Sequence, residues 1–262
     1  MQMIDIGELR LHTVQAGTGR PVLFLHALGT DLRLWEHVLP RLHAAAPGGL
    51  HSIRCDLRGH GLSDCPPPPY AMGALVHDAE ALLQALEVSG AVVVGCSLGG
   101  MVAQGLAIKR PDLVAGLVLS NTAARIGTAE IWQERIATMH DGGIRALSTP
   151  TLTRWFPPAF HTTPEITLWR HLLERTPPDG YAGCAAAIAG TDFHRPLQDL
   201  KMPCLGIAGS EDGSTPPDLV RETVDLIPGA EFALIRRAGH LPMVDRPDDY
   251  ADVLSAFLAR MG

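Results

Sequence analysis

Ser97 is the first candidate for chemistry because it stands between two glycines directly after an apolar run. Residues 95–99 read Gly-Cys-Ser-Leu-Gly, and a helix-like pattern follows without a break. A strand that ends at Val94, a tight turn and a helix that begins at Leu98 would lift the Ser97 hydroxyl out of a sheet. The two glycines suit such a turn, since a side chain at either position would strike the neighbouring strand or helix. The pattern predicts a nucleophilic serine at a strand-to-helix elbow.

A serine hydroxyl is a weak nucleophile at neutral pH, so it needs a base within hydrogen-bond reach and a carboxylate that orients the base. His240 is the candidate base, and Asp212 or the adjacent Glu211 is the candidate acid. Each follows a predicted strand, and the carboxyl ends of parallel strands meet at one edge of a sheet. We therefore expect the acid and His240 to approach Ser97 there.

An oxyanion formed by attack on a carbonyl needs hydrogen-bond donors, which main-chain N–H groups can supply. The expected donors are the N–H of Leu98, after the nucleophile, and that of Leu28, in the loop after a strand that ends at His26. Residues 56–63 read Asp-Leu-Arg-Gly-His-Gly-Leu-Ser, which we interpret as a loop that supports the site. His26 and His60 are expected to organise loops around the pocket and not to act chemically.

Composition and charge argue against several classes of partner and cofactor. The chain has 262 residues, a formal net charge of −7 and no block of Lys or Arg, which disfavours nucleic acid or an anionic membrane as a partner. Its 12 histidines lack metal-ligand spacing and its five cysteines are scattered, so we expect no metal and reduced, mostly buried thiols. We find no leader pattern, and we interpret the uncharged run 91–108 as a buried strand and helix and not as a membrane span. We therefore expect a cytoplasmic protein. A homo-oligomer stays open.

Strand-like and helix-like segments alternate along most of the chain, which is typical of a mostly parallel sheet with helices on both faces. Strands are expected at 4–6, 9–15, 22–26, 51–55, 91–94, 114–120, 204–208 and 231–235, and helices at 34–43, 72–86, 98–109, 217–226 and 248–261. Between 122 and 197 strand-like runs disappear. We expect an eight-stranded α/β core of residues 1–121 and 198–262, with a helical lid of residues 122–197 inserted into it.

These residues together resemble the α/β-hydrolase superfamily, and the likeness covers nearly the whole chain. The spacing from Asp212 to Pro216 is similar to the acid turn of that superfamily, which favours Asp212 over Glu211. Narrower similarity to the 3-oxoadipate enol-lactonases is found at residues 28–35, 121–127, 154–156 and 180–186. The resemblance implies a Ser-His-Asp triad that hydrolyses a small carboxylate-bearing enol-lactone to 3-oxoadipate in aromatic-compound catabolism, without a cofactor.

A carboxylate-bearing lactone or ester must enter a protein of net negative charge, so an arginine is expected near the pocket. Arg125, Arg135 and Arg154 are the candidates in the lid, with surface solvation as the alternative for each. Trp132 and Trp155 either wall the pocket or pack a small core of the lid. The same triad would serve a general carboxylesterase or a carbon–carbon bond hydrolase of a ring-cleavage product, and a non-catalytic ligand receptor is a further alternative.

Overall fold

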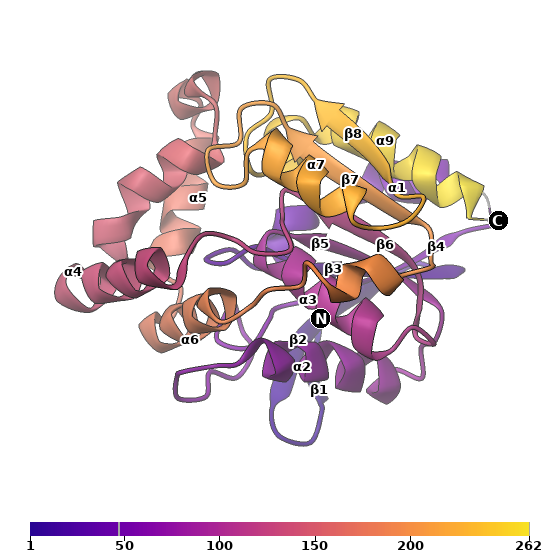
Figure 1. The fold of residues 1–262 in the computed structure, drawn as a ribbon, viewed down its shortest axis with the longest axis horizontal. Coiled ribbons are helices and arrows are strands. Elements are labelled where there is room, and N and C mark those ends of the chain that lie inside the picture. Colours follow the sequence, from indigo (N-terminus) through magenta and orange to yellow (C-terminus); the bar gives the residue numbers. More distant parts are fainter. Residues whose placement is uncertain (47, 262) are drawn as a thin grey trace.

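In the computed structural model, which describes residues 1–46 and 48–261, one eight-stranded sheet runs through the molecule with helices around it (Figure 1). The strand order is β1-β2-β4-β3-β5-β6-β7-β8; the two pairs that involve β2 are antiparallel and the other pairs are parallel. The strands are β1 (Gln2–Asp5), β2 (Arg10–Ala16), β3 (Arg20–Leu25), β4 (Leu50–Cys55), β5 (Ala91–Cys96), β6 (Val114–Ser120), β7 (Cys204–Gly209) and β8 (Glu231–Ile235). The predicted eight-stranded, mostly parallel sheet is confirmed.

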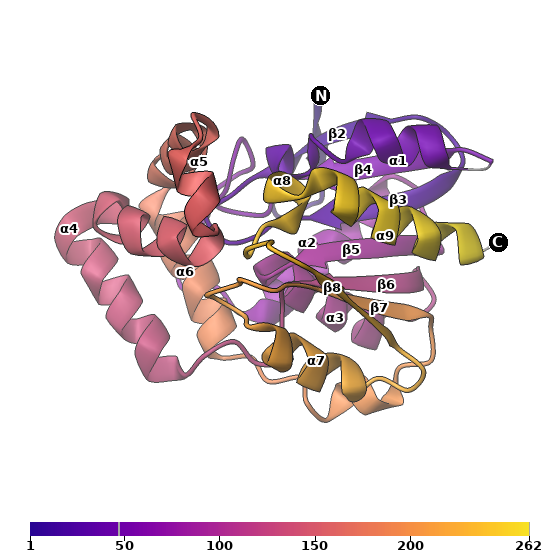
Figure 2. The same ribbon diagram turned by 90° about the horizontal axis from the view of Figure 1, so that it is seen from above.

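Helices cover both faces of this sheet (Figure 2). On one face α1 (Leu39–Ala45) packs against α9 (Pro247–Arg260), which follows the short α8 (Pro242–Asp245). On the other face lie α2 (Met72–Ala85), α3 (Leu98–Lys109) and α7 (Pro217–Asp225), with α2 and α3 packed together. The predicted α/β architecture with helices on both faces is therefore confirmed.

The position of β5 explains where a site can form. Val92, Val93 and Val94 are fully buried because β5 lies between β3 and β6 under helices on both faces. The chain adds β4 on one side of β3 and then places β5 on the other side, so the strand order reverses between β3 and β5. Ligands of open parallel sheets bind outside the carboxyl ends of the strands at such a switch point. The loops that follow β3 and β5 meet there.

Three helices between β6 and β7 lie together at the end of the sheet where these loops meet (Figures 1 and 2). They are α4 (Ala129–Trp155), α5 (Glu165–Glu174) and α6 (Pro178–Ala189). All three lie inside the segment that the sequence assigns to a lid, and the boundaries of that lid at 122 and 197 stay a prediction. Among the helices of residues 1–46 and 48–261, none combines the length and the hydropathy that a membrane span requires.

The expected helix at 34–43 is confirmed only in part, because the helix found there begins at Leu39. The chain instead forms a 3₁₀ turn at Leu32–Trp35 and then starts α1 at Leu39. Pro40 is the reason, because a proline inside a helix removes one hydrogen bond and its ring clashes with the carbonyl four residues earlier. Proline is tolerated in the first turn, so a new helix begins around Pro40.

Candidate active site

Ser97 lies in a strained turn between β5 and α3. Its φ of +53° is in the region that favours glycine, and helix α3 starts at the next residue. A Cβ on Gly95 would lie 2.2 Å from the carbonyl oxygen of Gly99, and one on Gly99 would lie 2.2 Å from that of Leu25. Both positions therefore require glycine. The structure places Ser97 as the elbow pattern predicts, with a hydroxyl-bearing side chain at the edge of a cavity.

The structure brings His240 and Asp212 together. The Nδ1 atom of His240 lies 2.8 Å from Oδ2 of Asp212, and both side chains are at least 98% buried. A carboxylate only accepts hydrogen bonds, so the proton of this pair lies on Nδ1. In the neutral imidazole, the Nε2 atom then has the lone pair that a base needs. Glu211 is exposed and lines a different cavity, together with Arg237. Asp212, and not Glu211, is thus the carboxylate that can orient His240.

The loop that carries Asp212 holds this carboxylate in its charged form. Oδ1 accepts the backbone N–H groups of Ser214 and Thr215 at 2.7 and 3.0 Å, and Oδ2 accepts the Thr215 hydroxyl at 2.8 Å. Burial alone would raise the pKa of Asp212, but the charge and hydrogen bond of His240 and the hydrogen bonds from Asn121 and Ser214 lower it below its ordinary value. The carboxylate therefore stays ionised beside His240.

Asn121 is a residue of this site that the sequence reasoning missed. Its Nδ2 group donates to Oδ2 of Asp212 at 2.8 Å and to the Gly239 carbonyl at 3.3 Å, and its φ is +47°. It directly follows β6, the strand beside β5, so its place at a strand end was the available signal. Asn121 links the acid loop to the histidine loop.

A cavity of about 520 Å³ opens between the core loops and the lid, and Ser97, His240 and Leu28 all line it. Leu28 belongs to the loop after β3, and Leu98 is the first residue of α3. The first N–H groups of a helix have no intrahelical acceptor, and no backbone carbonyl in the described part of the chain accepts the N–H of Leu28 or Leu98. Within the described residues, both predicted oxyanion donors are therefore free of a backbone partner and available to a ligand.

Lid residues form the opposite wall of this cavity. Trp132 and Trp155 line it and are also buried at 7% and 4% exposure, so each tryptophan walls the pocket and packs the lid. The end of α4 docks directly on the core loops, because the Trp155 carbonyl accepts the His240 N–H at 2.7 Å and the Arg154 carbonyl accepts the Gly213 N–H at 3.1 Å. These contacts place the last turn of α4 beside the candidate base.

Arg135 and Arg154 bring two positive charges into the cavity wall. Both donate to the Thr151 hydroxyl, at 2.8 Å from Arg135 and 3.4 Å from Arg154. The lid arginines Arg145 and Arg170 pair with Glu174, whereas no carboxylate among residues 1–46 and 48–261 forms an ion pair with Arg135 or Arg154.

Burial, and then the charge of Arg135, lower the pKa of Arg154. The Arg135 guanidinium also lies over the rings of Trp132 and Tyr181, at 5.3 and 5.7 Å from their centroids. Arg125, the third candidate, is exposed and does not line the cavity. Two of the three predicted arginines therefore line the same cavity as the candidate nucleophile and have no acidic partner among the described residues, as an anion site requires.

The structure also bears on metal and thiol chemistry. Within the described ranges, no three His, Cys, Asp or Glu side chains gather as ligands for a metal ion. All five cysteines lie in these ranges and are free, and four of them are buried. Cys96, next to the nucleophile, is fully buried, and burial raises the pKa of its thiol. Ser97 is thus the hydroxyl or thiol at the elbow that faces the cavity.

Comparison with known proteins agrees with this geometry. Residues 22–253 match the model of the alpha/beta hydrolase family. The chain is 32% identical to 3-oxoadipate enol-lactonase 2 of Acinetobacter baylyi, over 92% of this chain and 90% of the relative. The enol-lactonase of Burkholderia xenovorans LB400 superposes with a TM-score of 0.93 at 29% identity, covering 98% of this chain and 100% of the other. A thermophilic esterase of Thermogutta terrifontis, solved with malate bound, gives a TM-score of 0.90 at 29% identity and coverages of 97% and 94%. The chain belongs to the alpha/beta hydrolase family.

Proposed function

We propose that this hydrolase opens 3-oxoadipate enol-lactone, a small lactone that carries a carboxylate, to 3-oxoadipate. The observation that carries the proposal is the shared cavity, which Ser97 and His240 line together with two arginines that have no carboxylate partner among residues 1–46 and 48–261. The similarity to two enol-lactonases supports the same substrate class. A place in the catabolism of aromatic compounds through the β-ketoadipate pathway is part of the proposal.

The proposed reaction begins with attack of the Ser97 hydroxyl on the lactone carbonyl. His240 Nε2 takes the hydroxyl proton, while Asp212 orients the ring and stabilises the imidazolium. The N–H groups of Leu28 and Leu98 stabilise the oxyanion, each by roughly 3 to 4 kcal/mol in comparable enzymes. The bond between the carbonyl carbon and the ring oxygen then breaks, which leaves an acyl group on Ser97 and an enolate on the opened chain.

The His240 imidazolium gives its proton to the enolate, which becomes a ketone, so the leaving group cannot easily return and His240 is again a base. Water then attacks the acyl-enzyme with His240 as base. His240 returns the proton to the Ser97 oxygen as the acyl bond breaks, and a second carboxylate is released. The donor N–H groups and the base are the same in both halves of the reaction. This chemistry uses only protein groups and water.

Arg135 and Arg154 account for the carboxylate of the substrate in this proposal. Charge-assisted hydrogen bonds from guanidinium to carboxylate are stronger than neutral ones, and they also fix orientation. With the carboxylate bound at the lid wall, the lactone carbonyl can lie at Ser97 on the opposite wall. The apolar side chains of Trp132 and Trp155 would pack against the ring between these ends.

A general carboxylesterase is the second candidate, favoured by the similarity to a thermophilic esterase at 29% identity. The deciding experiment compares kcat/KM of the purified protein on 3-oxoadipate enol-lactone, p-nitrophenyl acetate and a dienoate from meta ring cleavage. We expect the enol-lactone to be the best substrate. Turnover of the lactone no faster than that of p-nitrophenyl acetate would refute the lactone assignment, and preference for the dienoate would indicate a carbon–carbon bond hydrolase.

Ser97→Ala provides the control for this comparison. We expect the variant to lose turnover of all three substrates, and we expect a fluorophosphonate to label Ser97 in the native protein only. A native protein that is neither labelled nor active would instead indicate a non-catalytic ligand receptor.

A further inference from the structure

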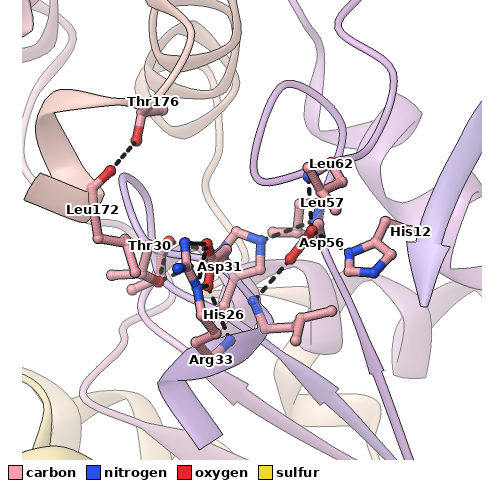
Figure 3. Close-up of polar contacts among 12 residues, drawn as sticks. His12, His26, Thr30, Asp31, Arg33, Asp56, Leu57, Leu62, Leu172 and Thr176 are labelled. Carbon is pink, nitrogen blue, oxygen red and sulfur yellow. Dashed lines mark hydrogen bonds and ion pairs between the residues drawn. The ribbon is translucent and has the colours of Figure 1, made fainter. Parts of the chain in front are cut away.

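The carbonyl group of Ala27 is held by three hydrogen-bond donors. The Thr30 N–H lies 3.1 Å from this oxygen, the Thr30 hydroxyl 2.8 Å and His26 Nδ1 2.8 Å. The other ring nitrogen of His26, Nε2, accepts the backbone N–H of Leu57 at 2.9 Å, so the ring proton lies on Nδ1 and is donated to Ala27. Figure 3 shows His26 between Thr30 and Leu57. The carbonyl is therefore fixed from two sides.

The next peptide group of the same loop is held by a second histidine. The backbone N–H of Gly29 donates to Nε2 of His60 at 3.0 Å, and Nδ1 of His60 lies 3.2 Å from the Arg58 carbonyl. Nε2 can accept only while it is unprotonated. Burial, and then the nearby His26, lower the pKa of His60 to about 3. The imidazole of His60 is thus neutral in the pH range where the enzyme would work.

These bonds determine the direction of the Leu28 N–H. The Ala27 carbonyl and the Leu28 N–H belong to one planar trans peptide group, so they point in opposite directions. Three donors on the carbonyl fix the plane and also polarise the N–H at its other end. The Leu28 N–H has no backbone acceptor in the described ranges, and Leu28 lines the cavity with Ser97.

We propose that Thr30, His26 and His60 are positioning residues that aim the Leu28 N–H at the oxyanion. They do not touch the substrate and act only through the Leu28 peptide group. The proposal rests on the serine mechanism given above, because that mechanism requires the Leu28 N–H as a hydrogen-bond donor to the oxyanion. It does not depend on which ester or lactone is the natural substrate.

The main test replaces Thr30 with Val, which keeps the shape of the side chain and removes the hydroxyl donor. With p-nitrophenyl acetate we expect kcat to fall about 10-fold and KM to stay unchanged, since only the transition state carries the oxyanion. Thr30→Ser retains the hydroxyl and should restore kcat. A boronic acid, which forms a tetrahedral adduct with the serine, should bind to Thr30→Val more weakly by the same factor.

Thr163 offers a matched control on the lid surface. Its N–H and hydroxyl contact the Phe160 carbonyl at 3.1 and 2.8 Å, the same distances that Thr30 makes to Ala27. Thr163→Val removes an equivalent hydrogen bond outside the oxyanion loop and outside the cavity that Ser97 lines, and it should leave kcat and boronate binding unchanged. A similar loss of kcat in both variants would show a general structural effect and overturn the proposal.

His60 gives an independent test of the second peptide group. In His60→Gln, Oε1 can replace Nε2 as the acceptor of the Gly29 N–H, whereas His60→Leu has no acceptor. We expect kcat and boronate affinity to fall together in His60→Leu and to be largely retained in His60→Gln.

The outcomes also separate this proposal from the proposed function. Native kcat and native boronate affinity in Thr30→Val would overturn the positioning role if Ser97→Ala is inactive in the same assay. Activity retained in Ser97→Ala would overturn the serine mechanism itself, and the positioning role with it.

Discussion

Arg154→Gln removes one of the two guanidinium groups that line the cavity with the candidate nucleophile and leaves a shorter, neutral polar side chain. Arg154 is a cleaner target than Arg135, because Arg135 also packs over Trp132 and Tyr181. The substitution should weaken productive binding of a substrate that carries a carboxylate. A neutral ester such as p-nitrophenyl acetate should be affected far less, because it has no group for the guanidinium to bind.

The size of the effect follows from the contacts that are lost. A hydrogen bond to a charged group contributes about 1.5 to 3 kcal/mol, and each 1.4 kcal/mol is a factor of ten in kcat/KM. We therefore expect kcat/KM for the enol-lactone to fall roughly 10- to 100-fold. Folding stability should not fall, since burial and the charge of Arg135 already disfavour the charged form of Arg154. The thermal midpoint should be equal or slightly higher.

Arg125→Gln is the control, since it removes a lid arginine of the same charge that is exposed and does not line the cavity. The assay measures kcat/KM on the enol-lactone and on p-nitrophenyl acetate for the native protein and both variants. Equal losses on the two substrates would refute a carboxylate-binding role for Arg154. An equal loss in Arg125→Gln would show that the overall positive charge of the lid, and not a contact, attracts the substrate.

Three further predictions concern the loops around the site. Burial raises the pKa of the Asp245 carboxyl to about 7 in the folded protein. The contribution of Asp245 to folding stability is therefore complete below its ordinary pKa near 3.8, and it is lost as the pH rises through 7 and the buried carboxyl becomes charged. In the native protein the Gly239 N–H donates to Oδ2 of Asp245 at 2.7 Å, and Asp245→Asn keeps an acceptor for it. The variant should raise the thermal midpoint at pH 8 more than at pH 5. Gly99→Ala should lower the free energy of unfolding in urea by more than about 2 kcal/mol or prevent folding, because the new Cβ meets backbone atoms of Leu25. Asn121→Gly removes the backbone strain of a side chain at positive φ, but it also removes a hydrogen-bond donor to Asp212. We expect kcat on p-nitrophenyl acetate to fall about 10-fold and the thermal midpoint to stay unchanged.

The central strands and the candidate catalytic residues were predictable from the sequence for a common physical reason. A run such as Val92 to Val94 is apolar on both faces, and only a strand in the middle of a covered parallel sheet buries it completely. Once the strands are placed, polar residues in the loops that follow them fall at one edge, which is how the acid and His240 were connected with Ser97. The start of the helix expected at 34–43 was misplaced because Pro40, which belongs in the first turn of a helix, overrides the apolar periodicity before it.

The convergence of Arg135 and Arg154 was beyond sequence reasoning, because it depends on a break inside α4. Gly143 has φ +71° and ψ 176°, so the chain leaves the helix there and forms a second helical arm (Figure 2). Arg135 lies on the first arm and Arg154 at the end of the second, and both reach Thr151. A continuous helix of that length would separate the two arginines by about 28 Å, at 1.5 Å per residue. The paired positive charge is therefore a product of the kink, and a substitution that straightens α4 at Gly143 would disperse it without touching either arginine.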